Sequence, residues 1–132
     1  MPNKEKIVIS QIKSNYCKRG FITKRDLLNV ESLLKQNPKN PSLWCFRGDL
    51  IQLSNANGYW NLNDALKSYR RAIKLNSNFQ EAYIEATYYH YAVQNSPKRA
   101  MKYLQKALKI KVTKVLLKLK QEIQKEISRN QK

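Results

Sequence analysis

The chain has 132 residues and a formal net charge of +17, with 42% hydrophobic residues but three glycines and four prolines. This hydrophobic content is too high for a disordered chain, and so few turn-forming residues disfavour a fold of many short strands. No apolar run approaches the roughly 18 residues of a membrane span, and residues 7–9 are too short an apolar start for a secretory signal. We therefore expect one cytoplasmic domain with a modest core.

The positive charge is concentrated at the two ends of the chain. Residues 1–39 hold nine lysines and arginines against three acids (+6), residues 40–97 five against four (+1), and residues 98–132 twelve against two (+10). One interpretation is a solvated surface in a lysine-rich chain. The other is affinity for an acidic partner, such as RNA, DNA, an anionic membrane or an acidic protein. The sequence leaves both interpretations open.

Two helices are predicted in the first third of the chain. Residues 4–18 place apolar side chains between lysines, and Gly20 suits a left-handed C-cap. Thr23 can cap a second helix over residues 24–36, which Pro38 ends because proline cannot continue a helix interior. These two segments form a first helical hairpin.

Two further helices are predicted in the middle of the chain. Residues 41–54 begin with a proline in the first turn, and Gly48 inside this helix indicates a close helix neighbour. Residues 62–75 carry a stripe of apolar side chains at helical spacing, formed by Ala65, Leu66, Tyr69, Ala72 and Ile73. The loop over residues 55–61 is longer than a minimal helix connection.

Three helices complete the prediction, over residues 80–93, 97–110 and 115–128. Ser96 and Thr113 are expected to cap the last two, since both precede an amphipathic stripe. The tyrosine-rich stretch in residues 83–93 lacks the strict alternation of a strand. The expected fold class is therefore all-α, with seven helices.

Within these helices two motifs resemble the tetratricopeptide repeat. The first is Trp44-x-x-Arg47-Gly48-x-x-Ile51 followed by Ala65-x-x-x-Tyr69-x-x-Ala72. The second is Tyr83-x-x-Ala86-Thr87-x-x-His90 followed by Ala100-x-x-x-Leu104-x-x-Ala107. The resemblance implies a right-handed superhelical stack of hairpins in a single domain over residues 1–132. It places repeats at 7–40 (degenerate, with Asp26 at a position where a small residue is expected), 41–79 and 80–114, and a C-terminal capping helix at 115–129.

The resemblance also implies a concave groove lined by the first helix of each hairpin. Its expected lining includes Gln11, Asn15, Cys45 and the proposed partner-binding residues Asp49, Gln52, Glu81, Ile84, Tyr88 and Tyr91. Two carboxylates, Glu81 and Glu85, disfavour capture of a peptide's C-terminal carboxylate, as chaperone-binding members of the family perform. A basic or mixed peptide, helical or extended, is better suited to Asp49, Glu81, Tyr88 and Tyr91, although Glu81 and Glu85 can equally be a solvated pair. Trp60, beside Tyr59 in the inserted loop, either anchors the partner or packs locally.

The basic C-terminal third offers an alternative function. Lys98, Lys102, Lys106, Lys109 and Lys118 form an expected surface for RNA or another polyanion, which would contact phosphates without reading bases. A third alternative is self-association through residues 115–129, whose apolar side chains exceed what one capping contact buries.

Enzyme chemistry finds no support in the sequence. The one histidine, His90, falls at a packing position, and the acids show no metal-ligand spacing. Cys17 and Cys45 lie in predicted helices and are expected to be buried, reduced thiols. We therefore expect a non-catalytic protein without a metal or cofactor.

Overall fold

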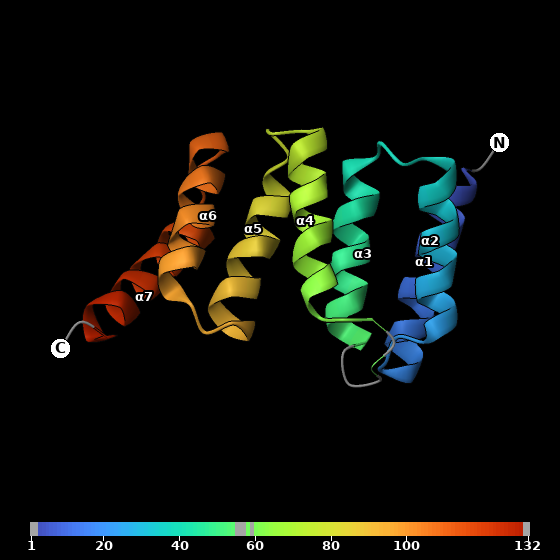
Figure 1. Ribbon diagram of the computed structural model, residues 1–132, viewed down its shortest axis with the longest axis horizontal. Helices are drawn as coiled ribbons and strands as arrows, with labels where there is room; N and C mark the ends of the chain where they lie inside the picture. Colours follow the sequence, from blue (N-terminus) through green and yellow to red (C-terminus); the bar gives the residue numbers. More distant parts are fainter. Residues whose placement is uncertain (1–2, 55–57, 59, 131–132) are drawn as a thin grey trace. The chain divides into compact units, whose positions relative to one another are not determined.

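A computed structural model describes residues 3–54, 58 and 60–130 of the chain (Figure 1). These residues form seven α-helices and one π-helical segment and contain no strand, which confirms the all-α fold class. The chain divides into two compact units, residues 1–68 and 69–132, and the division falls inside helix α4. The superhelical arrangement, the single domain and the repeat boundaries stay predictions.

The first unit contains three whole helices and the start of a fourth. They are α1 (Lys4–Arg19), α2 (Lys24–Gln36), α3 (Pro41–Ser54) and α4 (Asn63–Leu75), the last of which continues into the second unit. As predicted, Gly20 ends α1 in the left-handed conformation, with φ +80°, and its backbone N–H donates to the Tyr16 carbonyl. Glycine adopts this conformation without the strain that a Cβ atom would bring.

A reciprocal pair of hydrogen bonds fixes the start of α2. The Asp26 backbone N–H donates to Thr23 Oγ1 over 3.2 Å, and the Thr23 N–H donates to the Asp26 carboxylate over 2.9 Å. This capping box satisfies two N–H groups that lack partners inside the helix. It confirms Thr23 as the cap of the second helix.

The core of the first unit is drawn mainly from α2 and α3. Buried apolar residues there include Leu27, Val30, Leu33, Leu34, Leu43, Leu50 and Ile51. Within α1 only Ile12 is buried, and Ile7 is 53% exposed. The prediction that both cysteines are buried is wrong for Cys17, which is exposed on α1, whereas Cys45 is buried. Cys17 lies five residues after Ile12, the buried residue of α1, and this spacing turns it roughly 140° away from the buried side of the helix.

The second unit continues with α5 (Gln80–Tyr88), η2 (Tyr89–Val93), α6 (Pro97–Ile110) and α7 (Lys114–Asn130). The predicted single helix over residues 80–93 thus changes to π-helical geometry at Tyr89, where the Gln94 N–H donates to the Tyr89 carbonyl over 3.0 Å. Such a segment widens the helix by one residue per turn. The first two residues of this segment, Tyr89 and His90, are both buried.

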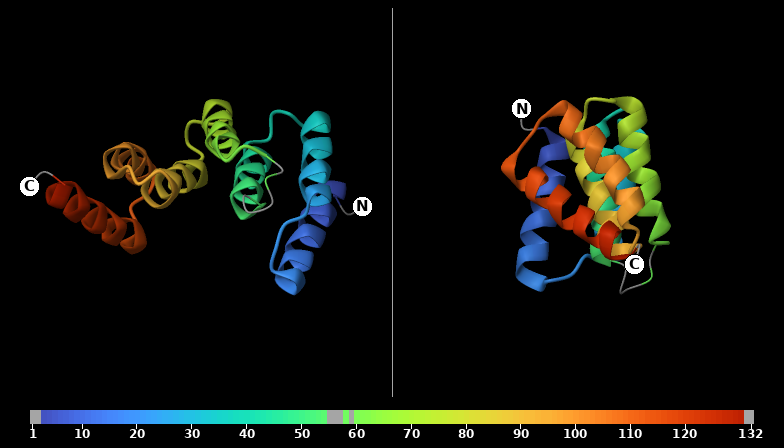
Figure 2. Two further views of the ribbon diagram at one scale, coloured as in Figure 1. Left: turned by 60° about the horizontal axis from the view of Figure 1, so that its bottom comes forward. Right: turned by 90° about the vertical axis from the view of Figure 1, so that its left-hand side faces the viewer.

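Helix α7 is an integral part of the second unit. Leu116, Leu119 and Ile123 of α7 join a buried cluster with Leu104 and Ala107 of α6. Figure 2 shows α6 (orange) joined to α7 (red) by a short turn. Thr113 caps α7 as predicted, since its hydroxyl accepts the Leu116 N–H over 3.2 Å. Ser96, in contrast, makes no side-chain cap on α6.

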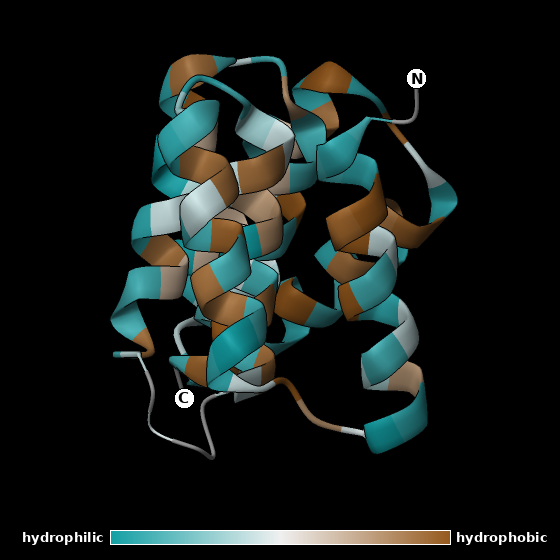
Figure 3. Ribbon diagram, turned by 90° about the vertical axis from the view of Figure 1, so that its right-hand side faces the viewer, coloured by the Kyte–Doolittle hydropathy of each residue, from teal (hydrophilic) through white to brown (hydrophobic). Residues whose placement is uncertain are grey.

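Four of the helices are clearly amphipathic. Figure 3 shows hydrophobic (brown) and hydrophilic (teal) residues alternating along the ribbons. Helices α2, α4, α6 and α7 each bury one apolar stripe and leave the opposite side polar, whereas apolar residues are spread more evenly around α1, α3 and α5. Among the described residues, no helix is both long and apolar enough to cross a membrane.

Candidate functional site

One side of α5 and of the π-helical segment that follows carries the predicted partner-binding residues of the second unit. Glu81 and Tyr88 are exposed, with Tyr88 at 39%, while Ile84 and Tyr91 are half-buried against the unit's core cluster. Spacings of three and four residues bring these side chains to one side of the helix. We call these four residues together with Glu85 the α5 face. It combines tyrosine and isoleucine surface with carboxylates.

The remaining predicted partner-binding residues belong to the first unit. Asp49 and Gln52 are half-buried on α3, and Trp60 is half-buried before α4. Tyr59 lies outside the described residues. Because the predicted groove draws on both units, a groove that joins α3 to α5 stays a prediction.

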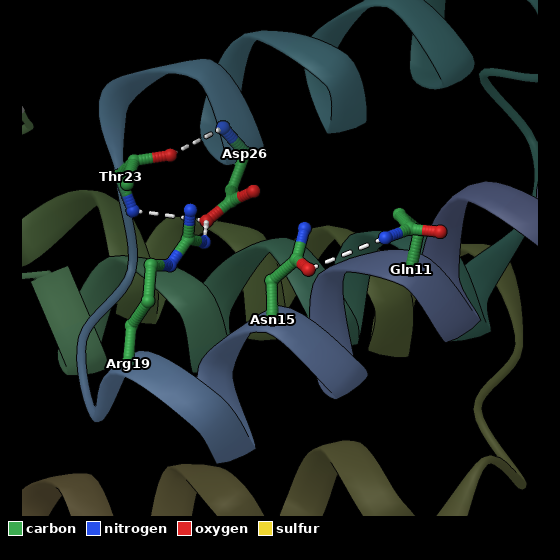
Figure 4. Close-up of polar contacts among 5 residues, drawn as sticks. All are labelled: Gln11, Asn15, Arg19, Thr23 and Asp26. Carbon is green, nitrogen blue, oxygen red and sulfur yellow. Dashed lines mark hydrogen bonds and ion pairs between the residues drawn. The ribbon is translucent and has the colours of Figure 1, made fainter.

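Two further predicted groove residues, Gln11 and Asn15, line a hollow between α1 and α2. The Gln11 amide donates to Asn15 Oδ1 over 3.2 Å (Figure 4). The hollow has a volume of about 320 Å³. Arg19 lies at the same hollow and donates to the Asp26 carboxylate over 2.9 Å. Asp26 is only 5% exposed and also accepts the Thr23 N–H, so this carboxylate is held by an arginine and by a helix cap. These contacts explain a charged residue at a position where the repeat pattern expects a small one.

A row of cations covers the exposed side of α6. Its members, which we call the α6 basic face, are Lys98, Arg99, Lys102, Lys106 and Lys109, all exposed. Three of them, Lys102, Lys106 and Lys109, line a hollow of about 500 Å³ together with Gln105, Leu108 and Lys120 of α7.

The structure thus brings together part of the predicted polyanion surface. Lys98 lies on the same helix outside the hollow, and Lys118 is exposed on α7 outside it. Lys120 lines the hollow, whereas the sequence led us to expect Lys118 there. Lys120 lies three residues before the buried Ile123 and is therefore beside the packed stripe of α7. Helical spacing on α7 was the signal that separates these two lysines.

Behind the α6 basic face lies the one histidine of the chain. His90 is 2% exposed, its ring stacks on Tyr103 with 5.2 Å between centroids, and neither ring nitrogen has a hydrogen-bond partner among the described residues. Burial lowers the pKa of His90 below 6.5, and the positive charges of Arg99 and Arg70 lower it further. Arg70 Nε also donates to the Tyr103 hydroxyl over 3.3 Å. The packing position predicted for His90 is confirmed.

A hairpin of the first unit matches a known family of helical repeats. Residues 23–54, which comprise α2 and α3, match the protein prenyltransferase alpha subunit repeat. The matched segment is a helical hairpin within the first unit, and it supports a helical repeat-like protein without singling out the tetratricopeptide family. No curated protein matches the chain significantly.

Proposed function

We propose that this protein is a cytoplasmic, non-catalytic interaction module with tetratricopeptide-like hairpins in a right-handed stack, and that it holds a peptide segment of a partner protein. The helical repeat match over residues 23–54 supports a protein-binding role at the level of the class. The α5 face is the observation that carries the proposal. Exposed tyrosine beside half-buried apolar side chains is the composition from which peptide-binding surfaces are built.

The charge of the α5 face indicates what the partner segment contains. Glu81 and Glu85 flank Ile84 and Tyr88 on the same side of the helix. A segment with an apolar anchor and at least one lysine or arginine would bury the anchor beside Tyr88 and place its cation near the carboxylates.

Selection from a random peptide library displayed on phage tests this proposal. We expect wild-type protein to enrich peptides that combine a basic residue with an apolar one, and Tyr88→Ala to lose this enrichment. Val115→Ala is the matched control, since Val115 is 67% exposed on α7 of the same unit. Enrichment that Tyr88→Ala leaves intact would contradict the assignment of the α5 face.

A second candidate function, polyanion binding, is favoured by the lysines gathered around the hollow between α6 and α7. The dependence of affinity on salt distinguishes polyanion binding from peptide binding, because phosphate contacts weaken steeply with ionic strength and apolar contacts do not. A homo-oligomeric scaffold through α7 is a third proposal. The apolar surface of α7 that is exposed for such contacts is smaller than the sequence indicates. Leu116, Leu119 and Ile123 are buried within the unit, whereas Val115 and Leu117 are exposed.

A further inference from the structure

The α6 basic face carries charge that the protein itself does not neutralise. None of its five cations forms an ion pair with a carboxylate among the residues that the structure describes. Lys98 and Arg99 also lie in the first turn of α6, which contains no acid, where the helix dipole disfavours positive charge. Like charges three and four residues apart on a helix repel each other by a few tenths of a kcal/mol per pair. A ligand with several negative charges would relieve this repulsion.

The chemistry of the hollow favours a nucleic acid over an acidic protein. Its lining holds four lysines, Gln105 and one aliphatic side chain, the half-buried Leu108. Lysine is depleted at the centre of protein interfaces, which depend on aromatic and aliphatic anchors. Ammonium groups are compact charges that attract phosphates without a fixed geometry. From Lys98 to Lys109 the face extends roughly 16 Å along the helix, long enough to follow several phosphates.

The contacts that the Tyr103 ring makes within the protein favour a double-stranded nucleic acid over a single-stranded one. Proteins that bind single strands stack bases on exposed aromatic rings. Tyr103 is the aromatic residue among the α6 cations, and it is half-buried, stacked on His90, covered by Lys106 at 5.9 Å and bound through its hydroxyl to Arg70. With this ring engaged, the face offers charge without a stacking surface, which suits a duplex whose bases are already paired.

Polar side chains beside the lysines favour RNA over DNA. Gln105 lines the hollow between α6 and α7, and Ser77 and Asn78 line a second hollow of about 410 Å³. Lys106 and Lys109 border both hollows. Amide and hydroxyl groups at the level of the phosphates can bond the ribose 2′-hydroxyl, the group that distinguishes RNA from DNA.

The end of α6 is held in place. Gln80 Nε2 donates to the carbonyls of Ala107 and Lys111 over 2.8 and 2.7 Å, which ties the start of α5 to the end of α6. A binding surface built on such a fixed helix is presented without further ordering on contact.

We infer that the α6 basic face and its two flanking hollows bind the backbone of double-stranded RNA, with Lys102, Lys106 and Lys109 on phosphates and Gln105 on a 2′-hydroxyl. This inference rests on the polyanion candidate and is independent of the α5 face.

Fluorescence anisotropy with an RNA duplex of about 16 base pairs tests the inference. The double variant Lys102→Gln, Lys106→Gln is expected to weaken binding by about tenfold or more and to lower the slope of log K against log salt by about two. The matched control is Lys24→Gln, Lys39→Gln, which removes the same charge from exposed positions of the first unit. Its slope should stay within about half a unit of the wild-type value. Equal losses of RNA affinity in the two double variants would overturn the site, since they would indicate that binding depends on the net charge of the protein alone.

Competing ligands complete the test. Gln105→Ala should reduce the preference for RNA over a DNA duplex of the same sequence while retaining the salt slope. Equal wild-type affinity for both duplexes, or tighter binding to poly-glutamate or to phosphatidylserine vesicles, would overturn the choice of RNA but retain the polyanion candidate. Failure of heparin and of every duplex to bind would contradict the inference and the polyanion candidate together. Tyr88→Ala should leave all of these affinities unchanged.

The single histidine supplies a readout that net charge cannot imitate. Phosphates beside Arg99 and Arg70 would counter the positive charges that help burial to lower the pKa of His90. Duplex RNA should therefore raise this pKa, as followed by NMR of the imidazole ring. An unchanged pKa at saturating RNA would exclude binding at this end of the α6 basic face.

Discussion

The two units of this chain use their charges differently. The first unit holds eleven lysines and arginines against five acids, and three of its carboxylates form ion pairs, namely Arg19–Asp26, Arg47–Glu31 and the solvated pair Lys67–Asp64. The second unit holds fifteen against four, and the cations of α6 form no ion pair among the described residues. The cations of α6 also lie together on one side of a helix, and three of them line one hollow. This clustering directs the search for function to the second unit.

The largest expected effect concerns whether α7 is a structural part of the second unit. Ile123→Ala should lower the free energy of unfolding by about 3 kcal/mol, because Ile123 is fully buried and its loss leaves a cavity. Leu117→Ala, at a position that is 44% exposed, should change it by less than about 0.5 kcal/mol. Urea denaturation measures both. A small effect at Ile123 would mean that α7 contributes little to the unit's stability.

The next prediction tests the structural role of charge in the first unit. Asp26→Ala should cost about 2 kcal/mol, since it removes a helix cap and a charge-assisted hydrogen bond at a buried position. Asp64→Ala should cost less than about 1 kcal/mol, because the Lys67–Asp64 pair is solvated. Thermal unfolding distinguishes the two. Similar small losses in both variants would show that ion pairs in the first unit are as dispensable as surface charge.

A smaller effect is expected from the buried histidine of the second unit. Burial and the nearby arginines lower the pKa of His90 in the folded protein. As the pH falls below 6.5, His90 is therefore protonated more readily in the unfolded chain than in the folded one. The free energy of unfolding should therefore fall as the pH drops below 6.5, and His90→Phe should remove this part of the pH dependence. Denaturation at pH 7.5 and at pH 5.5 measures the difference. The same slope in wild type and variant would contradict the burial of a neutral imidazole.

The sequence predicts the helices of this protein well because their signals are local. Apolar stripes, Gly20 and Thr23 fixed most helix ends to within a residue. The buried Asp26 follows from no local pattern, since its environment depends on Arg19 from the preceding helix. The π-helical segment that begins at Tyr89 could not be predicted from the sequence either, because it depends on how the side chains pack in the core.

The candidate sites divide in the same way. Lys102, Lys106 and Lys109 could be found from their helical rhythm on α6 alone. Helical spacing on α7 separates Lys120 from Lys118, but the packing of α7 against α6 is what brings Lys120 to the hollow. The α5 face was predictable as a set of residues, but its predicted continuation through Asp49 and Gln52 depends on the placement of two units.

The central claim is that the second unit holds the ligand surface, and NMR chemical-shift mapping with duplex RNA tests it most directly. We expect amide shifts to concentrate in residues 98–109 and around Lys120, with residues of α2 and α3 unchanged. Shifts spread evenly over the lysines of both units would contradict the claim, because they would show that the charge acts only as a diffuse field.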